Sequence, residues 1–309
     1  MLMLAGLVAG CSSSSTPRAP TTTATAPSST TPSIASSPSP PALNPAPARS
    51  SLNSCPPPQP EKALSIVARL QGAPDDLAST GDGVWVSDEN NGRISKLGSD
   101  GSLGSVLADP RGPEGIIPLD DGRLIVAEQR ADRVVVMRPP SAAVISTVAQ
   151  LQPVPGRDGI DSIALDAPRQ RLLLPDSAQG ALRVVAVDGG AITTLATGLG
   201  RVVAATVGPD GGIYVAAEGT PGLWRVPASG GSATPVGNLH DLDEVVTAGH
   251  LLYVTELADG TVRALDPASG DSRVLATGIG SPQGLAVLRD GRLAVTDSNR
   301  GLVLALQPC

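Results

Sequence analysis

The chain has 309 residues and carries 22 Lys and Arg against 29 Asp and Glu, a formal net charge of −7. Because no basic run is present to follow a phosphate backbone, this balance excludes a nucleic-acid binder and disfavours anionic membrane surfaces as partners. Phe is absent, and two Trp and two Tyr are too few for the aromatic platforms of sugar- or base-stacking sites.

The first eleven residues are apolar, end in small residues and are too short to span a bilayer. The last four, Val8-Ala9-Gly10-Cys11, resemble the lipobox of bacterial lipoproteins, in which the cysteine is lipidated and becomes the mature N-terminus. The resemblance implies that residues 1–11 are a lipoprotein signal and that Cys11 carries the lipid. The alternative is an apolar tail on a cytosolic protein.

Residues 12–60 consist mainly of Ser, Thr, Pro and Ala. Such a segment buries too little apolar surface to repay the entropy of ordering, and its prolines keep it extended. We expect a disordered stalk. Together with the lipobox, it predicts an exported protein whose folded domain faces outward and touches the bacterial membrane only through a lipid anchor.

Residues 61–309 are built from one repeating unit. An apolar strand is followed by an Asp-Gly turn, an alternating strand that ends in an acid, and a third strand, most plainly in residues 112–136, 202–226 and 281–304. Asp-Gly between alternating apolar runs is a strong signal for a hairpin. A turn such as 266–270 then leads to a fourth strand at 273–276.

The acid that closes the second strand recurs six times, at steps of 40, 48, 42, 38 and 41 residues: Asp88, Glu128, Asp176, Glu218, Glu256 and Asp297. Four-stranded units with a period near 40 are typical of propeller blades. No stretch shows sustained helical periodicity. The sequence therefore predicts an all-β fold, a six-bladed β-propeller with four-stranded blades, over residues 61–309.

The last unit lacks its fourth strand, because only residues 307–309 follow its third strand. Residues 65–74 align with residues 273–282, which contain the fourth strand leading into that unit. We therefore expect the N-terminal strand to complete blade six, which closes the ring and removes exposed sheet edges.

Cysteine usage predicts one disulfide. With Cys11 lipidated, Cys55 and Cys309 remain in an oxidising compartment, and both lie beside the junction where the two ends of the chain meet. We expect them to pair. The absence of any Cys-x-x-Cys excludes a zinc ribbon or a thioredoxin-like site, and two His exclude a His-rich metal site.

The blade pattern resembles the NHL-repeat propellers, whose repeats begin with Pro-x-Gly and close on Val-x-Asp, Asn and Arg-Ile. Residues 86–94, Val-Ser-Asp-Glu-Asn-Asn-Gly-Arg-Ile, match the second part. The resemblance spans residues 62–309 and extends more loosely to the senescence-marker and gluconolactonase-like propellers and to virginiamycin B lyase. It implies the architecture but no activity, because this fold hosts binders, sensors, hydrolases and lyases.

In such propellers the loops that lead into the first strands and leave the second strands share one face. The strand-closing acids there have a structural interpretation, in which each carboxylate accepts backbone N–H bonds and locks its blade. A second set precedes the first strands and would point at the central funnel. It comprises Asp75, Glu114, Asp161, Val203, Asp243 and Gln283.

Like charges on one axis repel unless they are solvated, protonated or bridged by a cation. We predict that Asp75, Glu114, Asp161, Asp243 and Gln283 converge, and that any metal they bind is Ca²⁺ or Mg²⁺, because hard cations prefer oxygen ligands. The alternative is that water separates the acids and that they only keep the rim soluble.

His240 lies in the loop that leads into blade five, beside this set. A funnel histidine next to carboxylates is a candidate general base. The alternative is a surface histidine without a role in chemistry.

Two functions follow. The first is a monomeric extracytoplasmic binding or sensing module for a small molecule or another exported protein. The second is a divalent-metal-dependent hydrolase or lyase of the lactonase type. The lactonase pattern has Glu before the first blade and Asn and Asp before later ones, whereas this chain has Asp75 there and its Glu, Glu114, in blade two. These departures favour the binding module.

Overall fold

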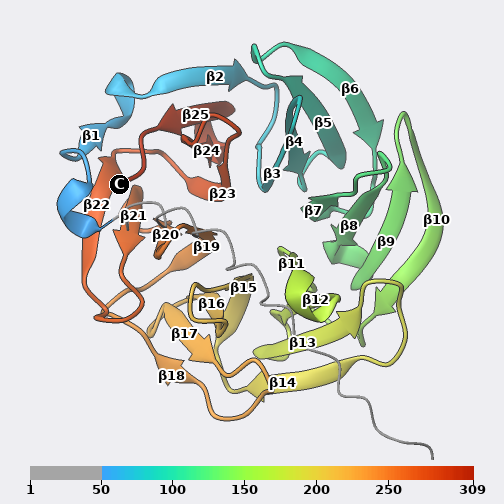
Figure 1. Cartoon of the computed structure of the whole chain (residues 1–309). Helices are drawn as coiled ribbons and strands as arrows, with labels where there is room; N and C mark the ends of the chain where they lie inside the picture. The colour runs from blue at the N-terminus through green and yellow to red at the C-terminus, as the bar shows by residue number, and fades with distance from the viewer. Residues whose placement is uncertain (1–50) are drawn as a thin grey trace, which may run out of the picture. The chain divides into compact units, whose positions relative to one another are not determined.

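The structure is a computed structural model that describes residues 51–309. They form six sheets arranged as blades in a ring, and the four strands of each blade are antiparallel (Figure 1). The six-bladed, all-β prediction is confirmed. Cys11, the expected signal and residues 12–50 of the expected stalk lie outside the described residues. Within residues 51–309, no helix is long and apolar enough to cross a membrane.

Each blade runs from an innermost strand near the axis to an outermost strand at the rim (Figure 1). Blade one contains β3 (Leu77–Thr80), β4 (Gly83–Asp88), β5 (Arg93–Gly98) and β6 (Leu103–Ala108). Blade two contains β7 (Pro113–Pro118), β8 (Leu124–Glu128), β9 (Arg133–Arg138) and β10 (Ser141–Gln150). Blade three contains β11 (Ala164–Asp166), β12 (Arg171–Asp176), β13 (Ala181–Ala186) and β14 (Thr193–Thr197).

The remaining blades follow the same order. Blade four contains β15 (Arg201–Val207), β16 (Ile213–Glu218), β17 (Leu223–Val226) and β18 (Thr234–Pro235). Blade five contains β19 (Leu242–Ala248), β20 (Leu251–Glu256), β21 (Thr261–Leu265) and β22 (Ser272–Thr277). Blade six contains β23 (Pro282–Val287), β24 (Leu293–Asp297), β25 (Leu302–Leu306) and, from the other end of the chain, β2 (Ser65–Arg69).

The ring closes as predicted, because β2 pairs antiparallel with β25 in blade six. Ser65 lies opposite Ala305, and Arg69 lies opposite Leu302. Pairing the two ends of the chain in one sheet couples the first and last blades and leaves no open edge between them.

The chain upstream of β2 is also attached to the propeller. A single 3₁₀ turn, η1 (Leu52–Ser54), precedes β1 (Gln59–Pro60), which pairs in parallel with β22 of blade five. Arg273 Nη1 donates to the carbonyl oxygen of Leu52 at 2.8 Å. Residues 52–60, whose composition indicates a stalk, therefore contact blade five through pairing that a Pro-rich composition does not reveal.

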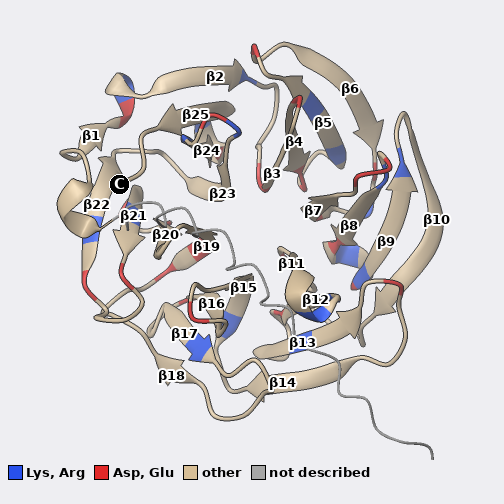
Figure 2. Ribbon diagram, viewed as in Figure 1, with Lys and Arg blue, Asp and Glu red and all other residues tan. Residues whose placement is uncertain are grey.

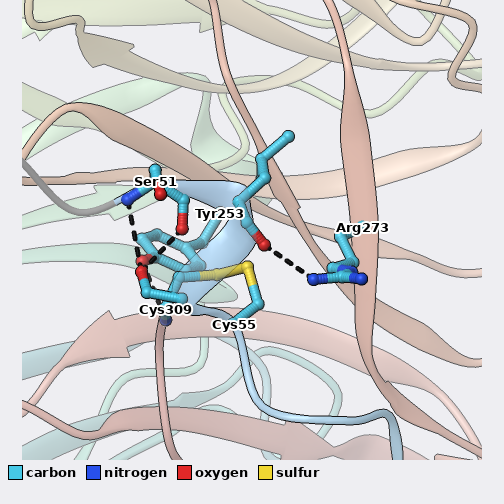
Figure 3. The surroundings of a disulfide bond; sticks show 7 residues. Ser51, Cys55, Tyr253, Arg273 and Cys309 are labelled. Carbon is cyan, nitrogen blue, oxygen red and sulfur yellow. Dashed lines mark hydrogen bonds between the residues drawn. A yellow bond between two sulfur atoms is a disulfide. The ribbon is translucent and has the colours of Figure 1, made fainter.

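The predicted disulfide joins Cys55 to Cys309 across 254 residues of chain (Figure 3). The Cys309 N–H donates to the Tyr253 hydroxyl oxygen at 3.3 Å, and both cysteines pack against the core between blades five and six. The bridge therefore ties the segment before β1 to the C-terminus.

Aliphatic side chains fill the spaces between neighbouring blades. Between blades three and four, for example, Leu173, Leu182, Val202 and Val215 form one buried cluster. With no Phe in the chain, second strands such as β24 are made of small and branched residues that fit between two sheets, and every residue of β24 is buried.

The six strand-closing acids pair with arginines, and the three aspartates among them also accept backbone N–H bonds, as the structural interpretation expects. Asp88 accepts from Arg93 Nη2 at 2.9 Å and from the Asn91 N–H at 3.1 Å. Asp176 accepts from Arg183 Nε at 2.6 Å, and the other four pair with Arg133, Arg201, Arg263 and Arg300. These ion pairs fix the face that carries the candidate site.

Candidate functional site at the propeller axis

Each blade has a pair of residues at or just before the start of its innermost strand, and in four blades the regular register is interrupted there. Register shifts fall at these pairs in β7, β15, β19 and β23. Such a bulge re-aims side chains and is common beside functional sites. The six pairs are Asp75-Asp76, Glu114-Gly115, Asp161-Ser162, Val203-Ala204, Asp243-Glu244 and Gln283-Gly284.

The second members of the pairs form an inner layer. Ser162 Oγ donates to Glu244 Oε2 at 3.2 Å, and the Asp76 carboxyl lies close enough for both side chains to affect its pKa. Asp76, Ser162 and Glu244 are 5%, 8% and 7% exposed and come from blades one, three and five. Three polar side chains from alternate blades therefore meet at the axis.

The intervening blades supply small residues at this level. A Cβ on Gly284 would lie 2.7 Å from Asp76 Cα and would overlap the carbonyl oxygen of Asp75. A Cβ on Gly115 would lie 2.8 Å from the carbonyl carbon of Ser162. Glycine is needed at both positions because neighbouring backbones approach too closely for any side chain.

The first members of the pairs include the five residues predicted to converge. Asp75 and Glu114 are 8% and 4% exposed, whereas Asp161, Asp243 and Gln283 are partly exposed. Figure 2 shows acidic residues at the ends of β3 and β19 nearest the middle of the ring. Asp75, Glu114, Asp161 and Asp243 lie near enough for their charges to act on one another, and apolar Val203 holds the sixth position.

Six carboxyl groups gather here and are called the axial cluster: Asp75, Asp76, Glu114, Asp161, Asp243 and Glu244. Burial, and then the charges of Asp76 and Asp161, raise the pKa of Asp75 well above its usual range. Burial and the charges of Asp75 and Asp161 do the same to the pKa of Glu114. Because each acid disfavours ionisation of the others, the cluster carries less charge than six carboxylates would.

The pKa values of the remaining members of the cluster are also raised. Burial, followed by the charge of Asp75, raises the pKa of Asp243, and burial with the charge of Asp76 raises the pKa of Glu244. Burial also raises the pKa of Asp76, although its contacts with Ser162 and Glu244 oppose the shift. Burial raises the pKa of Asp161 to about 8, against the opposing charge of Arg201.

Arg201 is the one basic side chain that pairs with the axial cluster within residues 51–309. Its Nη2 lies 3.2 Å from Asp161 Oδ2 and 3.2 Å from Asp158 Oδ2, and it also pairs with Glu218. Gln129 Nε2 adds a 3.4 Å contact to Asp161 Oδ2. One guanidinium shared by three carboxylates leaves the rest of the cluster uncompensated.

Several oxygens at the axis have no protein partner. Among the described residues, the buried Gln283 Oε1 forms no hydrogen bond, and the side chains of Asp75 and Glu114 form neither hydrogen bonds nor ion pairs. Across the same range, no three His, Cys, Asp or Glu side chains are arranged to hold a metal ion directly. The site thus offers unpaired oxygen donors but no closed coordination shell.

His240 takes part in a different set of contacts. Its Nδ1 lies 3.4 Å from Asp241 Oδ2 and its Nε2 lies 3.8 Å from Asp259 Oδ2, with 44% of the side chain exposed. Neither partner belongs to the axial cluster. The candidate general base is therefore in the outer loop of blade five.

Sequence reasoning missed four residues of the site: Asp76, Ser162, Gln129 and Arg201. Only the structure shows that the second residue of a pair also reaches the axis beside the first. The available signal was the doubling of polar residues in Asp75-Asp76, Asp161-Ser162 and Asp243-Glu244, which a single strand with one inward face does not require.

No family profile and no curated protein sequence matches the chain. Solved structures do. A calcium-binding regucalcin from Agrobacterium tumefaciens has a TM-score of 0.67 at 17% identity, over 80% of this chain and 94% of that one. A structure described as a putative gluconolactonase has a TM-score of 0.65 at 19% identity, over 79% and 92%.

A third similar structure is a catalytically inactive virginiamycin B lyase from Staphylococcus aureus with quinupristin. Its TM-score is 0.57 at 17% identity, over 77% of this chain and 82% of that one. Identities this low establish a common fold and nothing about activity. The chain therefore belongs, by fold, with the six-bladed β-propellers whose solved examples include regucalcin, gluconolactonase-like and lyase structures.

Proposed function

We propose that the protein is a divalent-cation-dependent hydrolase or lyase of the lactonase type, with the axial cluster as its centre. The observation that carries the proposal is a cluster of six carboxyl groups, four buried and two partly exposed, which within residues 51–309 is served by one guanidinium, that of Arg201. An unpaired buried charge costs several kcal/mol, on the order of the stability of a domain. The cluster therefore needs protons or a cation.

The residues present fit a hard cation. The unpartnered oxygens of Gln283, Asp75 and Glu114 are the donor type that Ca²⁺ and Mg²⁺ take in proteins. Since no three acids in the described part of the chain are arranged to coordinate directly, the donor set suits an ion that keeps part of its water shell, as Mg²⁺ commonly does.

A bound divalent cation would polarise a substrate carbonyl or lower the pKa of a water molecule. Asp161 and Asp243 are the partly exposed acids of the cluster, so a substrate would meet them first. Either could hold or accept a proton at a carboxylate oxygen. Arg201 fixes the orientation of Asp161 through Oδ2, and Asp76, Ser162 and Glu244 form a layer of polar side chains beside them.

The similar structures support this choice of class. Their descriptions name a calcium-binding protein, a putative gluconolactonase and a lyase. An acidic cluster of buried oxygens in the same fold is consistent with cation-assisted chemistry on an ester or lactone.

A second candidate function is an extracytoplasmic binding or sensing module. The specific observation in its favour is the placement of His240, which contacts Asp241 and Asp259 rather than the axial cluster. In that case the acids would attract a cationic small molecule or peptide and no turnover would follow.

Thermal unfolding of the full chain against Ca²⁺ and Mg²⁺ tests the proposal. Because an ion that binds only the folded state stabilises it, the melting temperature should rise by several degrees at millimolar cation, about 1 kcal/mol for each 2–4 °C. Glu114→Gln and Asp161→Asn should lose this gain, whereas Asp290→Asn, at an exposed turn, should keep it.

Hydrolysis assays with a panel of lactones then separate the two functions. Turnover that requires the cation and is lost in Glu114→Gln supports the enzyme. Cation binding without turnover supports the binding module, and no cation effect on melting contradicts a metal-dependent reaction.

We also propose that the protein is exported and anchored to the membrane by a lipid on Cys11. The proposal is supported by the lipobox-like residues 8–11 and by the composition of residues 12–50. The Cys55–Cys309 disulfide supports an oxidising compartment. Mass spectrometry of the native membrane fraction should find a diacylated N-terminal cysteine, and an unmodified chain in the cytosol would contradict it.

A further inference from the structure

A pocket of about 790 Å³ opens between blades three and four. Its walls are the loop that leads into blade three, the β12–β13 turn and the β14–β15 connection. The side chains used below are Val154, Arg157, Asp158, Ala178, Gln179 and Arg201. The pocket lies on the same face as the axial cluster, because it is bordered by loops that lead into first strands and leave second strands.

One wall of the pocket is formed by extra residues that make one repeat longer than the others. The step from Glu128 to Asp176 is 48 residues, the longest of the five. The structure places the excess in β10, the longest strand, and in the loop 151–163 that follows it. Val154, Arg157 and Asp158 belong to this loop, so the irregular repeat builds the pocket.

The pocket contains an unmatched positive charge. Arg157 Nη1 donates to the carbonyl oxygen of Ala178 at 3.3 Å, and within residues 51–309 no carboxylate lies within ion-pair distance of its guanidinium. Asp158, the neighbouring acid, pairs with Arg201 instead. The remaining N–H donors of Arg157 are therefore available to a ligand, and a guanidinium fork matches a carboxylate.

Arg201 connects the pocket to the axial cluster. It lines the pocket, and the same Nη2 that contacts Asp158 contacts Asp161 at 3.2 Å. A molecule in the pocket is thus separated from Asp161 by one side chain. The size of the pocket suits a small molecule, although few of the residues that line it are large and apolar.

We propose that this pocket binds the carboxylate of a small hydroxylated organic acid, with Arg157 as the anchor. Gln179 and the backbone N–H and C=O groups of the glycine-rich turns around it would form hydrogen bonds with the hydroxyl groups of the acid. As a substrate or product subsite this rests on the proposed function, since opening a lactone ring by water breaks the acyl C–O bond and yields a hydroxy acid. As a binding site it does not depend on catalysis.

Calorimetric titration of the cation-free full chain with gluconate and with the neutral polyol sorbitol tests the proposal. Gluconate should bind and sorbitol should not. Arg157→Gln should weaken gluconate binding about 10- to 100-fold, the effect of losing a charge-assisted hydrogen-bond pair. Arg138→Gln, an exposed arginine of blade two, should leave binding unchanged.

A second variant tests the location without removing charge. Val154→Trp should fill the pocket and abolish gluconate binding while Arg157 is retained. Equal binding of gluconate and sorbitol, unchanged binding in Arg157→Gln, or unchanged binding in Val154→Trp would each overturn the proposal. Glu114→Gln should still bind gluconate, because Glu114 does not line the pocket. Loss of the cation effect with gluconate binding retained would therefore contradict only the axial cation site, and loss of gluconate binding with the cation effect retained would contradict only this pocket.

Discussion

The guanidinium of Arg201 donates to the carboxylate of Asp161, with 3.2 Å between Nη2 and Oδ2. This contact joins the first strand of blade four to the loop that leads into blade three. Among the described residues, Arg201 is the one basic residue that pairs with the axial cluster. Asp161, the acid it pairs with, is also contacted by Gln129. The balance of charge at the axis therefore depends on this single pair.

Replacing Arg201 with Gln should destabilise the fold by about 1–3 kcal/mol, because Asp161, Asp158 and Glu218 lose their shared partner. Urea unfolding measures the change. Arg292→Gln is the matched control, since both arginines are 33% exposed and Arg292 pairs with an exposed aspartate at 2.8 Å. A loss no larger than that of the control would show that the axial pair contributes little.

The cation-free protein should become less stable as pH rises from about 4 to about 8. The pKa of Asp161 is raised from 3.8 to about 8, and those of Asp75, Glu114 and Asp243 are also raised. The folded state then binds more protons than the unfolded state. The resulting stabilisation is complete at a pH below the pKa values of the unfolded state, and it is lost as the pH rises through the pKa values of the folded state.

Melting temperatures across this range, in the presence of a chelator, check the pH prediction. Glu114→Gln should flatten the profile because it removes one titrating group and its repulsion. A melting temperature that increases steadily from pH 4 to pH 8 would contradict the raised pKa values.

Removing the Cys55–Cys309 disulfide should lower stability by about 5 kcal/mol at most, as expected from the chain entropy of a closed loop of this length. Cys55→Ser and Cys309→Ser should give equal losses, since both break the same bond. Chemical unfolding measures the losses, and alkylation of the native protein should find neither thiol free. Unequal losses would mean that one cysteine has another role in packing.

Gly284→Ala should cost about 1–3 kcal/mol or more, because its Cβ would overlap the backbone of Asp75 and Asp76. Gly81→Ala is the control. The nearest atom to a Cβ there, Arg289 Nη1, is 4.0 Å away, so the change should be neutral or slightly stabilising. Similar melting temperatures for the two variants would contradict the close approach at the axis.

Local patterns were sufficient to predict the architecture. Asp-Gly turns and the recurring acids from Asp88 to Asp297 set six four-stranded blades, and the missing last strand predicted the pairing of residues 65–69 with blade six. The Cys55–Cys309 pair followed from the same closure. Each of these features is repeated along the chain or fixed by its two ends, so it can be found without knowing any distance.

The contacts of the site depend on where bulges and loops place side chains. The alignment of first strands selected Asp75, Glu114, Asp161, Asp243 and Gln283, but not the inner layer of Asp76, Ser162 and Glu244, in which an irregular register positions Glu244 and the segments before β3 and β11 carry the other two. Arg201 and Gln129 reach Asp161 across 40 and 32 residues of sequence. Repeat periodicity fixes which strand a residue occupies, whereas burial, charge pairing and the pocket beside Arg157 arise only when neighbouring blades pack together.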